Sequence, residues 1–219
     1  MPSIFTSRRN GVSLAPYESL NLAQHVGDDY VSVSNNRHSL SLNTAPLQFM
    51  NQVHGDSVVE ITQVIPDPTC DALITTVPGI ALAVMVADCI PVLLSSSTVV
   101  GAVHVGRRGL VNSVAIKTIQ AMRKLGATRI HAQLGPSICG RCYEVPQNLA
   151  DEVCAEHPLA QSLTQRLTPS LDLTRALSAA LIEQGVTYEA SSICTLEDHE
   201  YFSYRRHKIT GRFAGVIWL

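Results

Sequence analysis

The chain has 219 residues, of which 46% are hydrophobic, so it can bury the core of one larger domain or of two small ones. Its formal net charge of −2 excludes the overall basic field typical of proteins that bind nucleic acid or anionic membranes. The longest apolar stretch, residues 77–94, is interrupted by Pro78, Asp88 and Pro91, which favours strands over a membrane span. The first residues contain no apolar segment of signal length, so we expect a cytoplasmic protein whose six cysteines form no obligatory disulfide.

In chain order, the apolar patterns predict strands that alternate with helices. The expected strands cover residues 58–65, 80–87, 90–94, 98–103, 129–134 and 212–219. The expected helices cover residues 110–125, which Gly126 ends at the C′ position, and Leu173 to about Gly185. This order predicts an α/β fold with a mixed sheet, and residues 1–219 show no internal domain boundary.

Two of these strands are separated by serines that predict an antiparallel hairpin. If the turn lies at Ser96 and Ser97, Cys89 lies directly opposite His104, with Cβ atoms roughly 4.5–5.5 Å apart. Such a pair could share one metal ion, or could act as a nucleophile and its base. The alternative is a small core cysteine beside an ordinary polar histidine, and a slip of one residue would put the two side chains on opposite faces.

Polar residues gather where apolar runs meet loops, the positions at which binding sites are usually built. The four clusters are Asn51–Asp56, Ala87–Cys89, His104–Gly109, and Tyr201–Arg206 together with Thr210–Arg212. In the third cluster, glycines flank Arg107 and Arg108 just before the expected helix, so backbone N–H groups and both guanidinium groups could face one anion. The alternative is a solvated turn with two surface arginines.

Cys139 and Cys142 form a lone C-x-x-C motif. A second such pair would strongly predict zinc, and the sequence has none, while Gly135-Pro136 before the motif leaves a redox dithiol only as a minor alternative. The remaining cysteines, Cys70, Cys154 and Cys194, show no partner pattern.

Several short motifs occur in an order that resembles a known family. They are Gln52-Val-His54-Gly, Ala87-Asp-Cys89-x-Pro91, His104-x-Gly-x-Arg108-Gly109, Gly135-Pro-x-Ile, Cys142-Tyr-Glu-Val145 and Phe202-Ser-Tyr-Arg-Arg206. Together they are similar to the motifs of the multicopper polyphenol oxidase, or laccase-domain, family, also called the YfiH family, from about Phe5 to Leu219. The resemblance implies an α/β fold in which one domain contains layered mixed β-sheets flanked by helices.

The resemblance also implies one zinc ion bound by His54, Cys89 and His104. It implies purine nucleoside chemistry, namely phosphorolysis of adenosine, inosine, guanosine and methylthioadenosine, together with deamination of adenosine. Three ligands leave a fourth zinc position open for water, which suits attack at C6 of adenine, with Asp88 beside Cys89 as the group that transfers protons. Phosphorolysis requires phosphate to be held below C1′ of the ribose, and Arg108, helped by Arg107, suits that role.

The chain departs from the family pattern in two motifs. Before Tyr143-Glu-Val, Arg141 precedes Cys142 where the family often has adjacent cysteines, which argues against a general role for the C-x-x-C motif. The other departure is in the motif that begins at His104. Val105 and Arg107 replace an Ala and a Trp, which removes an indole that could stack on a base and adds a charge that could bind an anion. The eight histidines include no His-x-His pair, which argues against polyphenol oxidase (laccase-like) chemistry.

Two further functions are compatible with the same residues. One is a cysteine hydrolase that uses Cys89 as nucleophile with His104 or His54 as base. The second is a non-enzymatic metal or nucleotide sensor. For the zinc enzyme, the expected partners are purine nucleosides and phosphate rather than nucleic acid or membrane, and the oligomeric state stays open.

Overall fold

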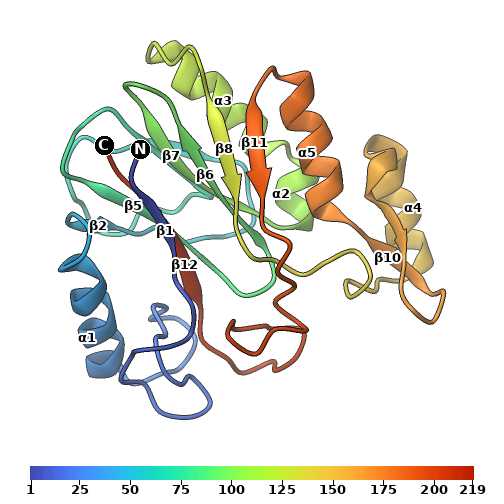
Figure 1. Cartoon of the computed structure of the whole chain (residues 1–219), viewed down its shortest axis with the longest axis horizontal. Helices are drawn as coiled ribbons and strands as arrows, with labels where there is room; N and C mark the ends of the chain where they lie inside the picture. The colour runs from blue at the N-terminus through green and yellow to red at the C-terminus, as the bar shows by residue number, and fades with distance from the viewer.

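Two β-sheets packed face to face form the centre of the chain in the computed structural model, which describes residues 1–219 (Figure 1). The larger sheet contains, in spatial order, β11 (Thr187–Ala190), β8 (His131–Leu134), β6 (Ile90–Ser95), β7 (Val100–Val105), β4 (Ala72–Thr75) and β3 (Val58–Glu60). The smaller sheet contains β1 (Ser3–Phe5), β12 (Phe213–Ile217), β5 (Ala81–Val86) and β2 (Leu47–Gln48). Both sheets mix parallel and antiparallel pairs, so the predicted α/β class with mixed sheets is confirmed.

Helices cover the outer faces of both sheets. The six-stranded sheet packs against α3 (Val114–Lys124) and α5 (Leu173–Glu183), and the four-stranded sheet packs against α1 (Tyr30–Ser41) (Figure 1). The remaining elements are α2 (Arg107–Val111), α4 (Gln147–Glu156), the 3-10 turn η1 (Pro158–Ala160) and the small hairpin of β9 (Gln161–Leu163) and β10 (Pro169–Leu171). None of the helices combines the length and the hydrophobicity needed to cross a bilayer.

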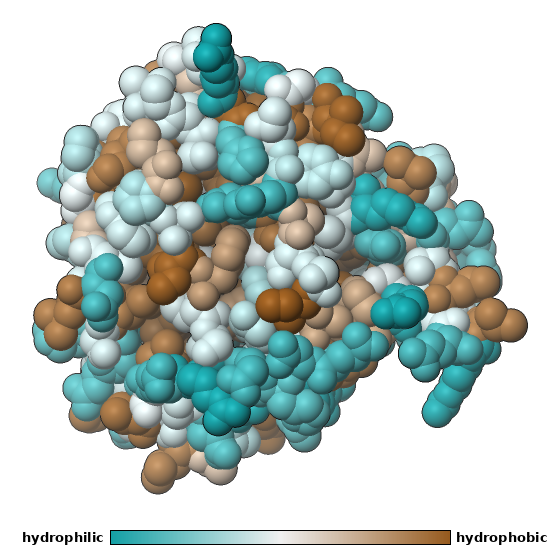
Figure 2. Space-filling model, viewed as in Figure 1, coloured by the Kyte–Doolittle hydropathy of each residue, from teal (hydrophilic) through white to brown (hydrophobic).

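The central strands are apolar on both faces because both faces are covered. In β5, Leu82 and Val84 pack toward the six-stranded sheet, whereas Ala81 and Ala83 pack toward α1. Strands that are buried on two sides have no polar face, which is why the sequence shows continuous apolar runs instead of alternation. On the exterior, Figure 2 shows hydrophobic residues scattered in small groups among polar ones on the face in view.

The predicted hairpin exists, but its register differs from the prediction. Pro91, rather than Cys89, lies opposite His104, because the turn has Ser97 and Thr98 at its tip. The Ser96 N–H donates to the Val99 carbonyl across a distance of 2.9 Å, which closes that turn. The displacement is two residues, an even number, so Cys89 and His104 stay on the same side of the pair as diagonal neighbours.

The helix predicted over residues 110–125 is two helices. Ser113 between α2 and α3 has a φ of 59°, in the left-handed region, and this breaks the helical path. The chain turns helical at Arg107, so Arg107 and Arg108 lie in the first turn of a short helix, and the prediction that they precede a long helix is wrong. Gly126 ends α3 with a φ of 91°, as predicted for a C′ glycine.

The other predicted elements exist with shorter bounds. The strand predicted over residues 58–65 ends at Glu60, and those predicted over 129–134 and 212–219 correspond to β8 and β12. The helix predicted from Leu173 corresponds to α5, which ends two residues before Gly185. The sequence patterns were too short or too polar to predict α1, α4 and the edge strands, whose positions depend on tertiary contacts.

Candidate functional site

Three donor side chains meet at one end of the central sheets. His54 lies in the loop between β2 and β3, Cys89 lies in the tight turn between β5 and β6, and His104 lies in β7. Their metal-binding atoms all lie within 4.8 Å of one another, and Cys89 Sγ is 3.9 Å from His54 Nε2. The two imidazole rings meet edge to face with centroids 4.6 Å apart. These three side chains therefore form a cluster that could hold a metal ion.

Asp71 organises this cluster from below. It is fully buried beside β4, and its carboxylate accepts hydrogen bonds from the backbone N–H groups of Val53, His54 and Gly55 across 3.2, 2.9 and 2.7 Å. These bonds stabilise the left-handed backbone of His54, which has a φ of 59°. One Asp71 oxygen also lies 2.8 Å from Nδ1 of His104, which leaves Nε2 of that ring free to face a metal.

Cys89 and His104 perturb one another's proton affinity. Burial alone would raise the pKa of Cys89, but the charge of His104 and hydrogen bonds with both histidines outweigh burial and lower it to about 6. Burial alone would lower the pKa of His104, but the Cys89 charge and the hydrogen bond to Asp71 raise it to about 9. The protein therefore favours a thiolate beside cationic imidazole, and a cation bound between them would take over that stabilising role.

The turns that carry the cluster leave it room on one side only. A Cβ atom added to Gly106 would lie 2.8 Å from Cys89 Sγ and 3.3 Å from the His54 ring, so only glycine fits there. Asp88 has a φ of 93°, a left-handed conformation that bends the chain sharply between β5 and β6. With two imidazoles, one thiolate and an orienting carboxylate already gathered, the residues present fit a zinc-type ion with an open ligand position.

The cluster opens into a cavity of about 560 Å³, a volume within the usual range for small-molecule sites. Positively charged and aromatic side chains line it: Arg107, Arg205, Lys208, Arg212, Tyr143 and Tyr204. Asp88 is the only carboxylate in its wall. A cavity with this charge balance suits an anionic ligand group, and the aromatic rings suit a flat, apolar one.

The two adjacent arginines that the sequence singled out differ in their access to the main cavity. Arg107 lines the main cavity and also a more open hollow beside α4 that His54 borders, whereas Arg108 is exposed and lines only that second hollow. Burial raises the pKa of Tyr143, and so does the Cys89 charge, while Arg107 and Arg205 oppose the increase. Arg205 lies over the Tyr143 ring at 5.1 Å, so this tyrosine sits among the cations of the cavity wall.

Asp88 is held by hydrogen bonds on both carboxylate oxygens. Oδ1 accepts from the Thr195 hydroxyl at 2.7 Å, and Oδ2 accepts from the Arg205 backbone N–H at 2.6 Å. Its carbonyl also accepts from the Ile138 N–H at 3.0 Å. Asp88 therefore ties two distant loops to the turn that carries Cys89, in addition to lining the cavity.

Sequence reasoning missed several of these residues. Asp71 interrupts the apolar approach to β4, and a carboxylate there was a usable signal, but its partner His104 lies 33 residues away. Arg205 and Arg212 belong to a polar cluster that the sequence identified. Nothing in the sequence indicated that their side chains would line the same cavity as residues of the other three clusters. Tyr143 follows Cys142 in one of the family motifs, and only its place in the cavity wall reveals a role.

Comparison with known proteins identifies the family. A family model described as multi-copper polyphenol oxidoreductase laccase matches residues 2–219. The chain belongs to this family. Curated relatives in it carry a different activity in their names. A protein from Streptomyces coelicolor, 46% identical over 98% of this chain and 94% of its own length, is named purine nucleoside phosphorylase. So is a protein from Pseudomonas aeruginosa, 38% identical over 98% of this chain and 91% of its own length.

Solved structures agree on the fold of this laccase family. A Neisseria meningitidis protein of family DUF152 is 35% identical, covers 99% of this chain and 93% of its own, and superposes with a TM-score of 0.91. The hypothetical protein YfiH of Bacillus licheniformis is 29% identical, covers 99% and 92%, and superposes with a TM-score of 0.90. The family resemblance inferred from the motifs is thereby confirmed.

Proposed function

We propose that this chain is a zinc-dependent purine nucleoside phosphorylase. The observation that carries the proposal is a His-Cys-His cluster opening into a cavity that also contains four cationic side chains. Phosphorolysis joins an anion to a nucleoside, so the cationic wall suits the phosphate, and a metal ion held by the cluster would supply Lewis acidity beside it. The names of the curated relatives support the same substrate class. The proposed substrates are adenosine, inosine, guanosine and methylthioadenosine.

His54, Cys89 and His104 would hold the zinc ion, with Asp71 orienting His104. When bound, zinc would supply Lewis acidity at the open position. A multicopper centre would need further histidine ligands nearby, and the one other donor cluster in the chain consists of three cysteines and a glutamate. The donor set therefore favours zinc chemistry over the laccase activity in the family's description.

The cationic residues would bind and orient phosphate. Arg107 enters the cavity from the first turn of α2, and Arg205, Lys208 and Arg212 enter it from the loop before β12. In the reaction, a phosphate oxygen forms a bond to C1′ of the ribose while the C1′–N9 bond breaks, and the base leaves with the bonding electrons and takes up a proton. Guanidinium groups that hold phosphate on one side of the sugar would supply the positioning this displacement needs. The sequence-based assignment of phosphate contact to Arg108 stays a prediction, and the cavity lining favours Arg107.

The purine would lie against the aromatic part of the wall. Tyr143 and Tyr204 line the cavity and would provide aromatic surface for a flat base, since Arg107 stands where the family motif has a tryptophan. Gln52 also lines the cavity, and both ends of its amide group bond to the backbone of Met85, at 2.7 and 2.9 Å. This holds Gln52 rigidly beside His54 and shapes the floor of the cavity.

We propose adenosine deamination as a second activity of the same cavity. It would exchange the C6 amino group of adenine for an oxygen of water, with ammonia as the leaving group. Asp88 is the carboxylate available in the cavity wall for the proton transfers. Its two hydrogen bonds to Thr195 and Arg205 leave it oriented, so it would act from a fixed position.

The test combines metal analysis with product analysis. Purified protein should contain zinc, and adenosine should give adenine and ribose 1-phosphate only when phosphate is added, and inosine and ammonia without it. Cys89→Ala should lose the site's metal and both activities together, whereas Cys154→Ala, remote from the cavity, should keep them. Phosphate-independent release of adenine would contradict phosphorolysis.

The low pKa of the Cys89 thiol also favours one competing function, a cysteine hydrolase that uses Cys89 with His104. This function requires metal-free protein to be the active form. Turnover that survives chelation and disappears on alkylation of Cys89 would support it and would exclude the zinc enzyme. The expected cytoplasmic location and the absence of nucleic-acid or membrane partners also remain proposals, which cell fractionation and binding assays would test.

A further inference from the structure

A second cluster of metal-binding side chains lies outside the cavity. Ligand atoms of Cys139, Cys142, Cys194 and Glu197 all lie within 4.8 Å of one another. The first two residues follow β8, and the last two follow β11. Since β8 and β11 are parallel neighbours, their carboxyl ends meet at the same edge of the sheet, and a bridge between Ser137 and Cys194 extends that pairing.

The two halves of the cluster have the same spacing. Cys139-x-x-Cys142 has a counterpart in Cys194-x-x-Glu197, in which a glutamate takes the place of the second cysteine. Each half is one tight turn. The N–H groups of Cys142 and Tyr143 donate to the Cys139 carbonyl at 3.0 Å each, and those of Glu197 and Asp198 donate to the Cys194 carbonyl at 3.1 and 2.8 Å. A helical turn brings residues three apart to the same side, so each half presents two donors.

The halves also contact one another. The Cys139 N–H donates to Cys194 Sγ at 3.3 Å, and the Cys142 thiol donates to Glu197 Oε1 at 3.4 Å. Four ligands at about 2.3 Å around a tetrahedral ion lie roughly 3.7 Å apart, so a contraction of about 1 Å at most would complete the shell.

We propose that Cys139, Cys142, Cys194 and Glu197 bind a second zinc ion, in a closed four-ligand site that positions the loops of the cavity. All six cysteines of the chain are free, so no disulfide competes for these sulfurs. Burial raises the pKa of Cys142, and the neighbouring thiols Cys139 and Cys194 raise it further. Zinc binds the thiolate form of cysteine, so metal binding would release the proton of Cys142.

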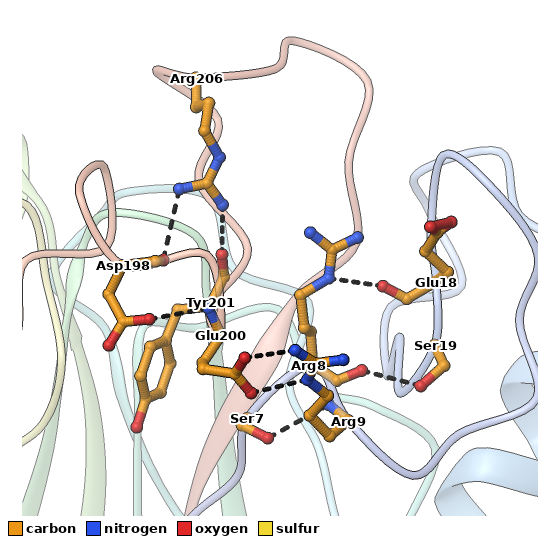
Figure 3. A network of polar contacts seen from close by, with 9 residues as sticks. All are labelled: Ser7, Arg8, Arg9, Glu18, Ser19, Asp198, Glu200, Tyr201 and Arg206. Atoms are coloured by element: carbon orange, nitrogen blue, oxygen red, sulfur yellow. Dashed lines mark hydrogen bonds and ion pairs between the residues drawn. The ribbon is translucent and has the colours of Figure 1, made fainter.

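Both loops of the cluster also reach the first site. Arg206 supports the loop after Cys194 from inside, donating to the carbonyls of Thr195 and Asp198 at 2.7 and 3.3 Å, and Figure 3 shows its guanidinium group spanning Asp198 and Tyr201. Thr195 and Arg205 both bond to Asp88, next to Cys89. A zinc ion between the loops would fix the position of Tyr143 and Arg205 in the cavity wall, so its ligands are positioning residues.

Metal counting tests the proposal directly. The protein is freed of any tag, loaded with zinc and dialysed. Elemental mass spectrometry should then find two equivalents of zinc per chain. Cys194→Ser should hold one equivalent, Cys89→Ala should hold one, and Cys154→Ser, the matched control, should hold two. One equivalent in the unaltered chain, unchanged by Cys194→Ser, would overturn the second site. So would a mass two hydrogens lower under non-reducing conditions, because a disulfide would then occupy these sulfurs.

Cobalt and a milder variant keep the test decisive if Cys194→Ser fails to fold. In Cys89→Ala protein loaded with cobalt, the remaining ion should show the intense near-ultraviolet absorption of several thiolate ligands. Glu197→Gln changes an exposed side chain, and it should weaken the second equivalent by at least the ~10-fold that loss of an outer-shell partner costs. Competition with a chelator measures that weakening, and unchanged affinity would exclude the four-ligand site.

Discussion

The two cysteine-containing clusters of this chain differ in ligand number and in what surrounds them. The His54–Cys89–His104 cluster has three donors and opens into a cavity lined by cations. The Cys139–Cys142–Cys194–Glu197 cluster has four donors, no histidine, and lies between two loops. Metal sites that hold substrate keep a position open, whereas sites that hold structure fill all four. This contrast agrees with the proposed roles, namely catalysis at the first cluster and positioning of loops at the second.

The thiols of the two clusters differ in the same direction. Burial would raise the pKa of Cys89, but the charge of His104 and hydrogen bonds with His104 and His54 outweigh burial and lower it to about 6. Cys142 has other thiols as neighbours, and burial together with those thiols raises its pKa. If both proposed sites bind zinc, Cys89 would already be a thiolate before the metal arrives, whereas the metal itself would have to displace the proton of Cys142.

We call the three-donor cluster of His54, Cys89 and His104 the open cluster, and the four-donor cluster the closed cluster. Removing Cys89, the only sulfur of the open cluster, should have the largest effect on activity. We expect Cys89→Ala to lower phosphorolysis by well over the ~100-fold that loss of an outer-shell partner costs, because a ligand itself is removed. The same protein should keep the closed cluster's metal. Steady-state rates and zinc content measured on one preparation check both statements. Near-normal turnover in this variant would contradict the proposal that the His54–Cys89–His104 cluster is catalytic.

Asp71→Asn should weaken the open cluster and leave the closed one intact. The amide keeps the volume of the buried side chain but lacks the charge that orients His104, so zinc affinity at the open cluster should fall roughly 10–100-fold. Asp56→Asn, an exposed neighbour that pairs with Lys117, is the matched control. Equal zinc affinity in the two variants, measured by chelator competition, would show that Asp71 supports only the backbone of the His54 loop.

Arg107→Ala and Arg108→Ala should have different effects on the KM for phosphate, because only Arg107 lines the main cavity. A hydrogen bond to a charged group contributes about 1.5–3 kcal/mol, so losing an Arg107–phosphate contact should raise the KM for phosphate roughly 10–100-fold. Arg108→Ala should change it by less than about threefold if Arg108 contacts only solvent. The reverse ranking in initial-rate measurements would restore the sequence-based assignment to Arg108 and would move the phosphate to the second hollow beside α4.

The smallest expected effect is on the rate at which the cysteines of metal-free protein are alkylated. Cys89 and Cys142 should differ in how this rate depends on pH. The Cys89 pKa is lowered to about 6, so its thiolate persists above that pH and is lost as the pH falls through it. Its alkylation rate should fall about tenfold from pH 7 to pH 5. Cys142, whose pKa is raised, should stay unreactive across that range and react only in strongly alkaline solution. Peptide mass spectrometry after iodoacetamide treatment distinguishes the two thiols.

The sequence predicted contacts between residues that are close along the chain, and it missed contacts between residues that are far apart. Cys89 and His104 were paired from one hairpin, and a register error of two residues did no harm because side chains alternate with a period of two. Asp71 escaped notice because its contact with His104 crosses from β4 to β7. Cys194 and Glu197 escaped because they meet Cys139 only through the parallel pairing of β8 and β11, which no local pattern encodes.

The fold shows the same limit. Buried runs predicted the central strands, since an apolar segment with two covered faces needs no partner-specific signal. The division of residues 107–124 into two helices depends on one left-handed residue, Ser113, a conformation that the sequence does not announce. Short edge strands such as β2 and β11 form because they pair with an adjacent strand of the sheet. Their own residues do not predict a strand.

The position of β12 has a consequence for how the protein is made on the ribosome. This strand lies between β1 and β5, with Ser3 opposite Ile217, so β1 has no sheet partner until β12, more than 200 residues further along the chain, has been synthesised (Figure 1). The loop that delivers Arg205, Lys208 and Arg212 is anchored by the same strand. A nascent chain in which β12 has not yet left the exit tunnel therefore lacks both a closed small sheet and a complete cavity, so the cavity is completed only when this strand joins the sheet.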